Sequence, residues 1–351
     1  FARLEPRQFA VLLPECSFTQ AQTVATELRE SVNQSRFRWH DEAFELTMAL
    51  GVIALAPGST PPDAMRHALS ALRVASGQGA NRLHASPPQD AQHERRLSLQ
   101  TWRSAVQEAI DGDQFQLFYQ PIALCASLKA GAVPQPTHVE ILLRMQHAEG
   151  GPIAAKDFIT AAEQFSMMPT VDKWVVSRVF QLLDSPAFVD RTRDIDRFGI
   201  NLSGQSISDP SFLDYVLGLT NAAGFDTRRI YFEITETAVV ENLQRAQTFI
   251  HALRARGIEF ALDDFGVGSS SYSYLRSLDV AYLKIDGAFV RDIIRHDADR
   301  AVVESMNQIG HSFGLRTVAE FVESPEQLDV LSDIGVDFAQ GSLVGEPRLL
   351  T

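Results

Sequence analysis

The stretch from residue 230 to residue 266, IYFEITETAVVENLQRAQTFIHALRARGIEFALDDFG, contains one complete unit of a repeating pattern. Its two ends, Ile230–Ile234 and Phe260–Asp263, are short apolar runs of strand length. Between them, Val239–Arg256 carries apolar residues at helical spacing. A strand, a helix and a second strand in this order predict two parallel strands joined by a helical crossover.

The same alternation extends in both directions from this unit. Eight strand-like apolar runs follow Phe115, at Leu117–Pro121, Val139–Arg144, Phe198–Leu202, Ile230–Ile234, Phe260–Asp263, Tyr282–Ile285, Thr317–Ala319 and Phe338–Gln340. Helical patterns separate most of them, at Ala155–Leu183, Pro210–Ala223, Val239–Arg256, Gly287–Phe313 and Pro325–Ile334. Eight strands that alternate with helices predict an α/β fold of the TIM type, a (β/α)8 barrel.

The first connection of the barrel departs from this pattern. Between Pro121 and Val139 the chain carries Gly131, Pro134 and Pro136 but no convincing helical pattern. Parallel neighbours need a crossover of about a dozen residues or more, usually a helix. We therefore expect the first two strands to pair as an antiparallel hairpin.

Residues 1–86 form a separate, partial α/β segment. Strand-like runs at Phe9–Pro14 and Phe44–Ala56 alternate with helical patterns near Thr19–Ser35 and Pro62–Ser76. A Ser-Pro-Pro sequence at 86–88 marks a boundary, and apolar residues at near-helical spacing follow it. We therefore divide the chain into a partial α/β domain at 1–86, a connecting helix at 87–111 and the barrel at 112–351.

Composition excludes several classes of function. Asp and Glu outnumber Lys and Arg by 44 to 31, so the net charge of −13 does not favour nucleic acid or an anionic membrane as a general partner. The two cysteines, Cys16 and Cys125, form no CxxC pair, which fits a reducing compartment and no thiolate metal site. The chain opens at Phe1 without a signal-peptide pattern. We expect a cytoplasmic fragment of a longer protein, with any membrane anchor outside it.

Polar residues stand inside or directly after most of the predicted strands, where burial alone would not place them. They are Glu140, Asn201, Glu233, Asp263, Asp264, Lys284, Glu320 and Gln340. In a (β/α)8 barrel the C-terminal strand ends form one mouth, so these side chains should converge there. Five carboxylates that face one lysine cannot all stay ionised in a partly buried site without cations. Carboxylate and amide oxygens favour Mg²⁺ or Mn²⁺.

The adjacent pair Asp263-Asp264 indicates the chemistry. One aspartate can bridge two ions while its neighbour holds the second, as in two-metal phosphodiester hydrolysis. Lys284 can then orient or deprotonate the attacking water, or stabilise charge on the phosphoryl oxygens. A lone carboxylate at a strand end is more often a helix cap or a surface ion pair. For Glu236 and Glu323 the structural and the functional role both remain open.

At these residues the sequence resembles the EAL-domain cyclic di-GMP phosphodiesterases, over about residues 98–349. The Glu-Ala-Leu signature stands here as Glu140-Ile141-Leu142, followed by the usual Leu143-Arg144. The resemblance implies a barrel with an antiparallel first strand and two Mg²⁺ or Mn²⁺ ions. It also implies cyclic di-GMP as substrate and a homodimer formed through the barrel.

The resemblance also implies a role for each site residue. It makes Glu140, Asn201, Glu233 and Asp263 ligands of the first ion, with Asp263 and Asp264 around the second, and it places Glu320 and Gln340 in the metal and water shell. It assigns Lys284 to the attacking water and Glu236 to anchoring the loop after Asp264. Arg144 would meet a substrate phosphate, with Leu142 and Asp286 as further substrate contacts.

Departures from the family pattern lie outside these ligands. In the loop after Asp264, Val267 and Ser269 replace Thr and Tyr, and Gly266 and Gly268 are typical of a mobile loop. Near the C-terminus, Ser342, Val344 and Glu346 replace two aromatics and a basic residue on the guanine side of the site. We expect weaker base stacking and a lower affinity for substrate.

Residues 1–86 resemble the second half of a GGDEF diguanylate cyclase domain. Glu5-Pro6-Arg7-Gln8-Phe9 stands where the family has Gly-Gly-Asp-Glu-Phe, so the glycines and the acidic pair that cyclisation needs are missing. The leading hypothesis is an enzyme that hydrolyses cyclic di-GMP to linear pGpG, with this degenerate domain as regulator. One alternative is a receptor that binds cyclic di-GMP without cleaving it and signals through the connecting helix. Another is a hydrolase of a different phosphodiester.

Overall fold

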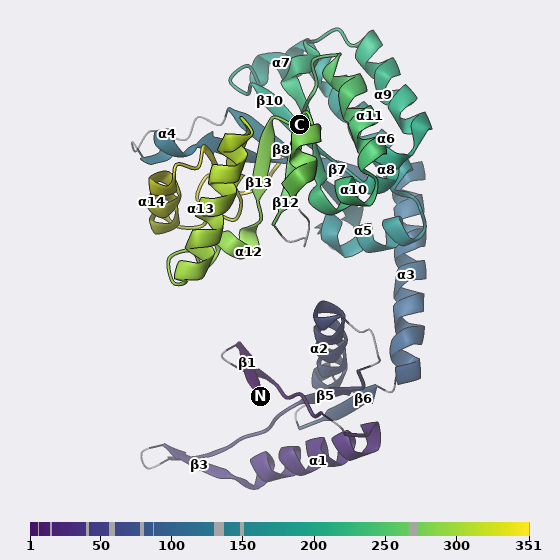
Figure 1. Cartoon of the computed structure of the whole chain (residues 1–351). Coiled ribbons are helices and arrows are strands. Elements are labelled where there is room, and N and C mark those ends of the chain that lie inside the picture. The colour runs from purple at the N-terminus through teal and green to yellow at the C-terminus, as the bar shows by residue number, and fades with distance from the viewer. Residues whose placement is uncertain are drawn as a thin grey trace. The chain divides into compact units, whose positions relative to one another are not determined.

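The computed structural model describes residues 1–5, 7–14, 16–39, 42–55, 60–77, 81–86, 88–129, 137–147, 151–266 and 272–350. The chain separates into two compact units, Phe1–Thr101 and Trp102–Thr351 (Figure 1). The boundary between them falls inside helix α3, Pro88–Asp111.

Before α3, the described residues of the N-terminal unit form two helices and three pairs of short strands. Its elements are β1 Ala2–Glu5, β2 Gln8–Ala10, α1 Phe18–Gln34, β3 Arg36–Trp39, β4 Glu42–Glu45, β5 Leu50–Ile53, α2 Pro61–Gly77 and β6 Leu83–Ser86. The pairs β1–β2 and β3–β4 are antiparallel, and the pair β5–β6 is parallel. A capping box between Ser17 and Gln20 starts α1.

Both strands expected in this unit are shorter than the apolar runs that predicted them. The run Phe9–Pro14 contributes only β2, which ends at Ala10. The run Phe44–Ala56 divides into β4 and β5, because residues 46–49 leave the strand conformation. Apolar content alone does not fix where backbone pairing ends, and Phe9, Val11 and Leu12 of the first run are exposed, so the runs overestimate strand length.

Eight strands close into the predicted barrel. They are β7 Phe115–Leu124, β8 His138–His147, β10 Arg197–Leu202, β11 Ile230–Thr235, β12 Glu259–Phe265, β13 Tyr282–Ile285, β14 Arg316–Ala319 and β15 Phe338–Gln340. Their order around the ring is β7-β8-β10-β11-β12-β13-β14-β15, with β15 paired back to β7. Strand β7 is antiparallel to both neighbours, and the other pairs in the ring are parallel. The (β/α)8 barrel and its antiparallel first hairpin are therefore confirmed.

Helices cover the outside of the ring (Figure 1). Their bounds are α4 Cys125–Lys129, α5 Ala155–Gln164, α6 Met168–Leu183, α7 Pro186–Arg191, α8 Gly204–Ser208, α9 Pro210–Ala222, α10 Glu236–Glu241, α11 Leu243–Arg254, α12 Gly287–Val290, α13 Asp297–Ser312 and α14 Pro325–Ile334. Two 3-10 turns are η1 Thr227–Arg229 and η2 Tyr272–Ser277. Strands β9 Gly151–Ala154 and β16 Arg348–Leu349 add to β8 and β7 outside the ring.

Three helices expected to be continuous are divided in the structure. The pattern Ala155–Leu183 breaks into α5 and α6 at Ser166, whose φ of 54° lies in the left-handed region. The pattern Val239–Arg256 breaks at Asn242, where φ is −147°. The pattern Gly287–Phe313 divides into α12 and α13. The breaks span one to six residues, and the apolar spacing on their two sides does not reveal them.

The connection from β7 to β8 begins with the five-residue helix α4, which the sequence did not indicate. This helix is too short to serve as a crossover between parallel strands. Gly131, Pro134 and Pro136 of the same connection lie outside the described residues.

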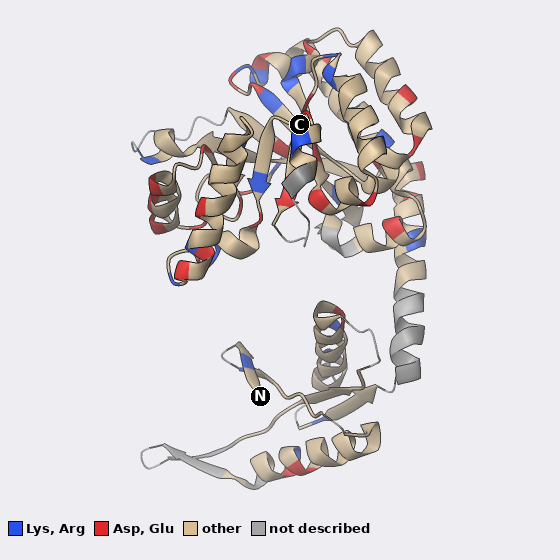
Figure 2. Cartoon of the chain, in the orientation of Figure 1, with Lys and Arg blue, Asp and Glu red and all other residues tan. Residues whose placement is uncertain are grey.

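Two features concern the surface of the structure. Among the described residues no helix is both long and apolar enough to cross a bilayer. In Figure 2 the ribbon is red at Asp and Glu positions of α13, of α14 and of several strand ends of the barrel unit, with blue Lys and Arg positions interspersed. The negative net charge is thus spread over several elements of this unit.

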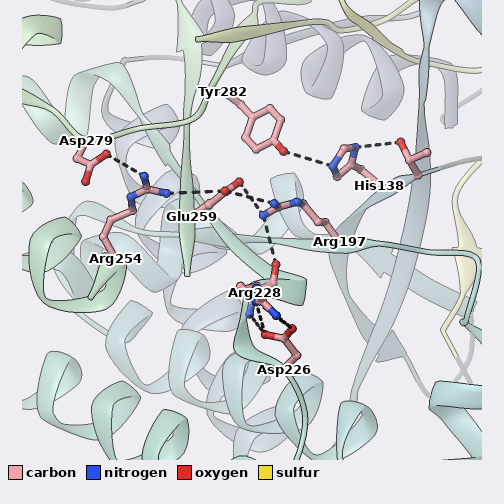
Figure 3. Close-up of polar contacts among 9 residues, drawn as sticks. His138, Arg197, Asp226, Arg228, Arg254, Glu259, Asp279 and Tyr282 are labelled. Carbon is pink, nitrogen blue, oxygen red and sulfur yellow. Dashed lines mark hydrogen bonds and ion pairs between the residues drawn. The ribbon is translucent and has the colours of Figure 1, made fainter. Parts of the chain in front are cut away.

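An aromatic and ionic layer closes the end of the barrel opposite the C-terminal strand ends. Inside the ring, His138 packs between the rings of Tyr231, Tyr282 and Phe338, with centroid distances of 5.0 to 6.2 Å. Figure 3 shows His138 hydrogen-bonded to Tyr282, beside the ion pair of Arg197 with Glu259. Burial, together with the positive charges of Arg197 and Arg316, lowers the pKa of His138 to about 4.

This shift predicts a pH-dependent stability. In the unfolded chain a histidine titrates near 6.5, so between about pH 6.5 and 4 the unfolded chain binds a proton that folded His138 rejects. Folding stability should therefore decrease as the pH is lowered from about 6.5 to 4. His138 should account for a loss of about 3 kcal/mol at pH 4. We expect His138→Gln to remove this pH dependence from the free energy of unfolding, measured by urea titration at each pH.

The control variant is His251→Gln on the exposed face of α11. It should keep the wild-type slope between pH 6.5 and 4. If the free energy of unfolding depended on pH equally in wild type and His138→Gln, His138 would already carry a proton in the folded protein.

Candidate active site

The polar residues that the sequence places at strand ends converge inside the C-terminal end of the barrel, called here the barrel mouth. Strands β8, β10, β11, β12, β13 and β15 supply Glu140, Asn201, Glu233, Asp263, Asp264, Lys284 and Gln340, and Glu320 follows β14 directly. Glu140, Glu233, Asp263, Lys284 and Gln340 are buried. Seven separate strands thus contribute to a single polar cluster.

Lys284 is the centre of this cluster. Its Nζ lies 3.4 Å from Glu140 Oε2, 3.1 Å from Asp263 Oδ1 and 2.7 Å from Glu320 Oε1. It also forms an ion pair with Glu233 Oε2. The side chain of Lys284 is only 2% exposed, so water screens these four ion pairs little.

A small apolar cavity lies beneath Lys284. It holds about 10 Å³, and its lining includes Lys284, Tyr231, Tyr282, His138 and Phe338. The lysine stem therefore passes through the aromatic layer of the barrel, while only its ammonium group meets the carboxylates.

Two amide side chains hold Glu140. Asn201 Nδ2 donates to Glu140 Oε1 at 2.6 Å, and Gln340 Nε2 donates to Glu140 Oε2 at 2.5 Å. Gln340 Nε2 also lies 3.3 Å from Gln120 Oε1, which the sequence analysis did not single out. Gln120 carried the same signal as the others, because it interrupts the apolar run of the first strand.

A glycine makes room for Glu233. Gly199 on β10 has no side chain, and a Cβ at that position would overlap Glu233 Oε1 and the ring of Tyr231. A glycine inside a strand often marks such a close approach. Gly199 is a second residue that the sequence analysis missed.

A bulge explains how two consecutive aspartates reach the same site. Successive strand residues normally point to opposite faces. In β12 the pairing register with β13 shifts between Leu262 and Phe265, and Asp264 has a φ of 53°. The bulge turns the Asp264 side chain so that Asp263, Asp264 and Glu320 each place one carboxylate oxygen within 4.8 Å of the others.

The titration behaviour of the site reflects burial and mutual repulsion. Burial and the charge of Glu140 raise the pKa of Glu233 well above its usual value. Burial raises the pKa of Glu320 to about 8, although Lys284 opposes this shift. Burial, with the charges of Asp263 and Asp286, raises the pKa of Asp264 to about 6. The cluster therefore holds more negative charge than its own lysine neutralises.

At the two groups in the centre, Lys284 and Glu140, the surroundings favour the charged form. Burial disfavours the charge on Lys284, but its four carboxylate neighbours outweigh burial and hold its pKa well above the usual value. Burial also disfavours ionised Glu140, but Lys284, Gln340 and Asn201 hold its pKa below the usual value. In this arrangement Lys284 is a charged donor.

The donor set fits divalent cations of the magnesium type. Five carboxylates face one lysine, and the additional donors are amides. Gln340 Oε1 is buried and accepts no hydrogen bond from the described residues, and the Asp263 Oδ1 oxygen faces Lys284 Nζ at 3.1 Å. Oxygen donors of this kind suit Mg²⁺ and Mn²⁺, whereas no Cys or His belongs to this cluster of described residues.

Glu236 ties together the two sides of the loop that follows β12. Its Oε2 accepts from the backbone N–H of Gly266 at 3.0 Å, and its Oε1 accepts from the hydroxyl of Tyr274 at 2.8 Å. Tyr274 was not expected from the sequence. Val267, Gly268 and Ser269 of this loop lie outside the described residues.

The expected substrate contacts lie around the mouth. Arg144 and Leu142 are half-buried on β8, and the Arg144 guanidinium lies 5.7 Å from the ring centre of Phe118. Asp286 caps α12 by accepting from Ala288 N at 2.6 Å. The Glu323 side chain is exposed, and its backbone N–H donates to Gln327 at the start of α14.

Sequence comparison identifies related proteins. Residues 103–347 match the sequence model of the EAL domain, and residues 1–82 match that of the diguanylate cyclase, GGDEF domain. The cyclic di-GMP phosphodiesterase PdeB of Shewanella oneidensis is 33% identical over 353 residues, which cover 99% of this chain and 40% of PdeB. The cyclic di-GMP phosphodiesterase PdeF of Escherichia coli is 30% identical over 246 residues, which cover 70% of this chain and 31% of PdeF. The chain thus spans well under half the length of either protein.

Solved structures of related proteins are also similar to this chain. The PaMucR phosphodiesterase in complex with c-di-GMP superposes with a TM-score of 0.65 at 26% identity, covering 71% of this chain and 97% of that one. The EAL domain of FimX from Xanthomonas citri, also in complex with c-di-GMP, gives a TM-score of 0.63 at 25% identity, covering 74% and 98%.

Proposed function

The chain belongs to the EAL domain family, and from that premise we propose that its barrel hydrolyses cyclic di-GMP to the linear dinucleotide pGpG. The observation that supports the proposal most strongly is the completeness of the polar cluster at the barrel mouth. Six oxygen-donor residues and one central lysine meet there from β8, β10, β11, β12, β13 and the end of β14, with β12 supplying both Asp263 and Asp264.

We assign the metal positions as follows. Glu140, Asn201, Glu233 and Asp263 would hold one Mg²⁺ or Mn²⁺ ion, and Asp263, Asp264 and Glu320 would hold the second. Bound divalent ions lower the pKa of a water and stabilise charge on the attacking and leaving oxygens of a phosphodiester.

The remaining side chains orient the reactants. Water attacks phosphorus, the ribose 3′ oxygen leaves with a proton, and one of the two phosphodiester bonds of the ring opens. Lys284, held as a cation, donates to the attacking water or to a phosphoryl oxygen. Arg144 pairs with a substrate phosphate, Leu142 and Asp286 border the bound dinucleotide, and Gln340 keeps Glu140 in place.

The rival function is a receptor that binds cyclic di-GMP without turnover. The retained ligand set favours the enzyme, because a pure receptor has no need of a cluster with so much unbalanced charge. The test incubates the protein with cyclic di-GMP and Mn²⁺, with and without a chelator, and follows the products chromatographically. Metal-dependent release of pGpG supports the enzyme, whereas tight binding without product supports the receptor.

We further propose that residues 1–86 regulate the barrel, residues 112–351, through the connecting helix 87–111, and that the protein is a cytoplasmic homodimer. Residues 1–82 match the GGDEF domain, but the metal-binding acids of its motif are replaced at Glu5-Pro6-Arg7-Gln8, of which Pro6 lies outside the described residues. The replaced motif predicts no cyclic product from GTP. Regulation predicts a change in cyclic di-GMP turnover when GTP is added. Unchanged turnover at every GTP concentration would contradict it.

A further inference from the structure

A buried carboxylate outside the barrel mouth accepts three hydrogen bonds from a single turn. Asp172 on α6 is 4% exposed. Its Oδ2 accepts from Ser203 N at 3.0 Å, from Ser203 Oγ at 2.7 Å and from Ser206 Oγ at 2.6 Å. The turn Ser203–Ser206 begins α8, where Ser203 is also the N-cap that accepts from Ser206 N. One oxygen therefore fixes both ends of this turn.

The turn directly follows the strand that carries Asn201. Asn201 is the penultimate residue of β10, and its Nδ2 donates to Glu140 Oε1. With that donor engaged, Oδ1 is the atom that Asn201 offers to a cation. Only Leu202 separates Asn201 from Ser203, so the position of Ser203 restrains the end of β10. Helices α6 and α8 lie side by side in this region (Figure 1).

The buried position of Asp172 would be unfavourable if the stability of the fold were its only purpose. Burial raises the pKa of Asp172 to about 6, although its three hydrogen bonds favour the carboxylate. In the described part of the chain these bonds come from hydroxyl and amide groups of this turn, and no cation forms an ion pair with Asp172. Burying an unpaired charge is unfavourable, and an apolar residue would cover the same surface of α6 more cheaply.

We propose that Asp172 is a positioning residue for the candidate metal site, which holds the turn Ser203–Ser206 and thereby keeps the Asn201 amide at Glu140. The inference rests on the proposed function, since it assigns Asn201 to a metal ion. Groups that orient metal ligands from outside the coordination sphere typically change metal affinity by 10- to 100-fold when removed.

The test measures Mn²⁺ affinity by titration calorimetry in the absence of substrate, with Asp172→Ala, Asp172→Asn and wild type. Asp172→Ala removes the acceptor and should weaken Mn²⁺ binding at least about 10-fold. Asp172→Asn keeps a neutral oxygen at the same place and should weaken binding less, by about threefold, because charged acceptors bond more strongly. Amide hydrogen exchange at Ser203–Ser206 should quicken in the same order.

The matched control is Asn307→Ala. Asn307 on α13 is also 4% exposed, and it accepts from Thr317 Oγ1 at 2.6 Å and donates to the carbonyl of Ile334. Its loss should lower the melting temperature without changing Mn²⁺ affinity. Unchanged affinity in both Asp172 variants would overturn the inference, as would an equal loss in Asn307→Ala. A wild type that binds no Mn²⁺ would overturn the proposed function and this inference together.

Discussion

Lys284→Met should destabilise the metal-free protein and remove hydrolysis, and Mn²⁺ should restore the stability but not the activity. The substitution leaves four carboxylates around a buried position without their cation. Removing one partner of a buried ion pair typically costs about 3–5 kcal/mol. A divalent ion can neutralise the same carboxylates, so the free energy of unfolding should recover in Mn²⁺. Hydrolysis should stay at least about 100-fold lower, as for the loss of a donor to a transition-state oxyanion.

The control for this variant is Lys129→Met. Lys129 forms a 2.9 Å ion pair with Asp333, but both side chains are exposed, so its loss should change neither stability nor turnover measurably. Urea unfolding with chelator and with Mn²⁺ measures the stability of each protein. A Lys284→Met protein as stable as wild type in chelator would mean that the carboxylates are already protonated, and the electrostatic account of the site would fail.

Glu233→Gln should have the opposite effect on stability and a similar effect on function. The raised pKa of Glu233 means that its ionised form is disfavoured in the folded state, so at neutral pH the carboxylate weakens folding. A neutral glutamine of the same shape removes the repulsion from Glu140 and Asp263. The metal-free melting temperature should rise, while Mn²⁺ affinity falls at least about 10-fold and turnover with it.

Glu259→Gln serves as the matched control at the other end of the barrel. Glu259 pairs with Arg197 at 2.6 Å and lies near Arg254, so its neutralisation should lower stability or leave it unchanged, without affecting Mn²⁺ binding (Figure 3). Calorimetric melting with chelator and Mn²⁺ titration give both quantities. If Glu233→Gln melted below wild type in chelator, Glu233 would be a stabilising partner of Lys284 and not a strained ligand.

The strands of the barrel and most residues of the polar cluster at its mouth could be predicted because the same sequence feature marks both. A polar residue at the end of a buried run, such as Glu233 or Lys284, marks the strand and the mouth together. The antiparallel hairpin followed from what its connection lacks, since residues between Pro121 and Val139 show no crossover helix. Each of these inferences depends on residues close together in sequence.

What the sequence did not reveal depends on contacts between distant residues. The bulge that turns Asp264 into the site has no local signature, because Ala-Leu-Asp-Asp-Phe reads as an ordinary strand. Tyr274 on η2 meets Glu236 on α10 across 38 residues of sequence. Asp172 stands on a helix whose apolar pattern is strong enough to suggest a simple core-facing segment. The breaks at Ser166 and Asn242 were hidden for the same reason, since helical spacing continues across them.

Anomalous scattering from crystals soaked with Mn²⁺ and a non-hydrolysable cyclic di-GMP analogue tests the central claim most directly. The account predicts two peaks about 3.5–4 Å apart, as in other two-metal sites. One should lie among Glu140, Asn201, Glu233 and Asp263, and the other beside Asp263, Asp264 and Glu320. An absence of any peak between Glu140 and Asp263, with Lys284 still paired to all four carboxylates, would contradict it.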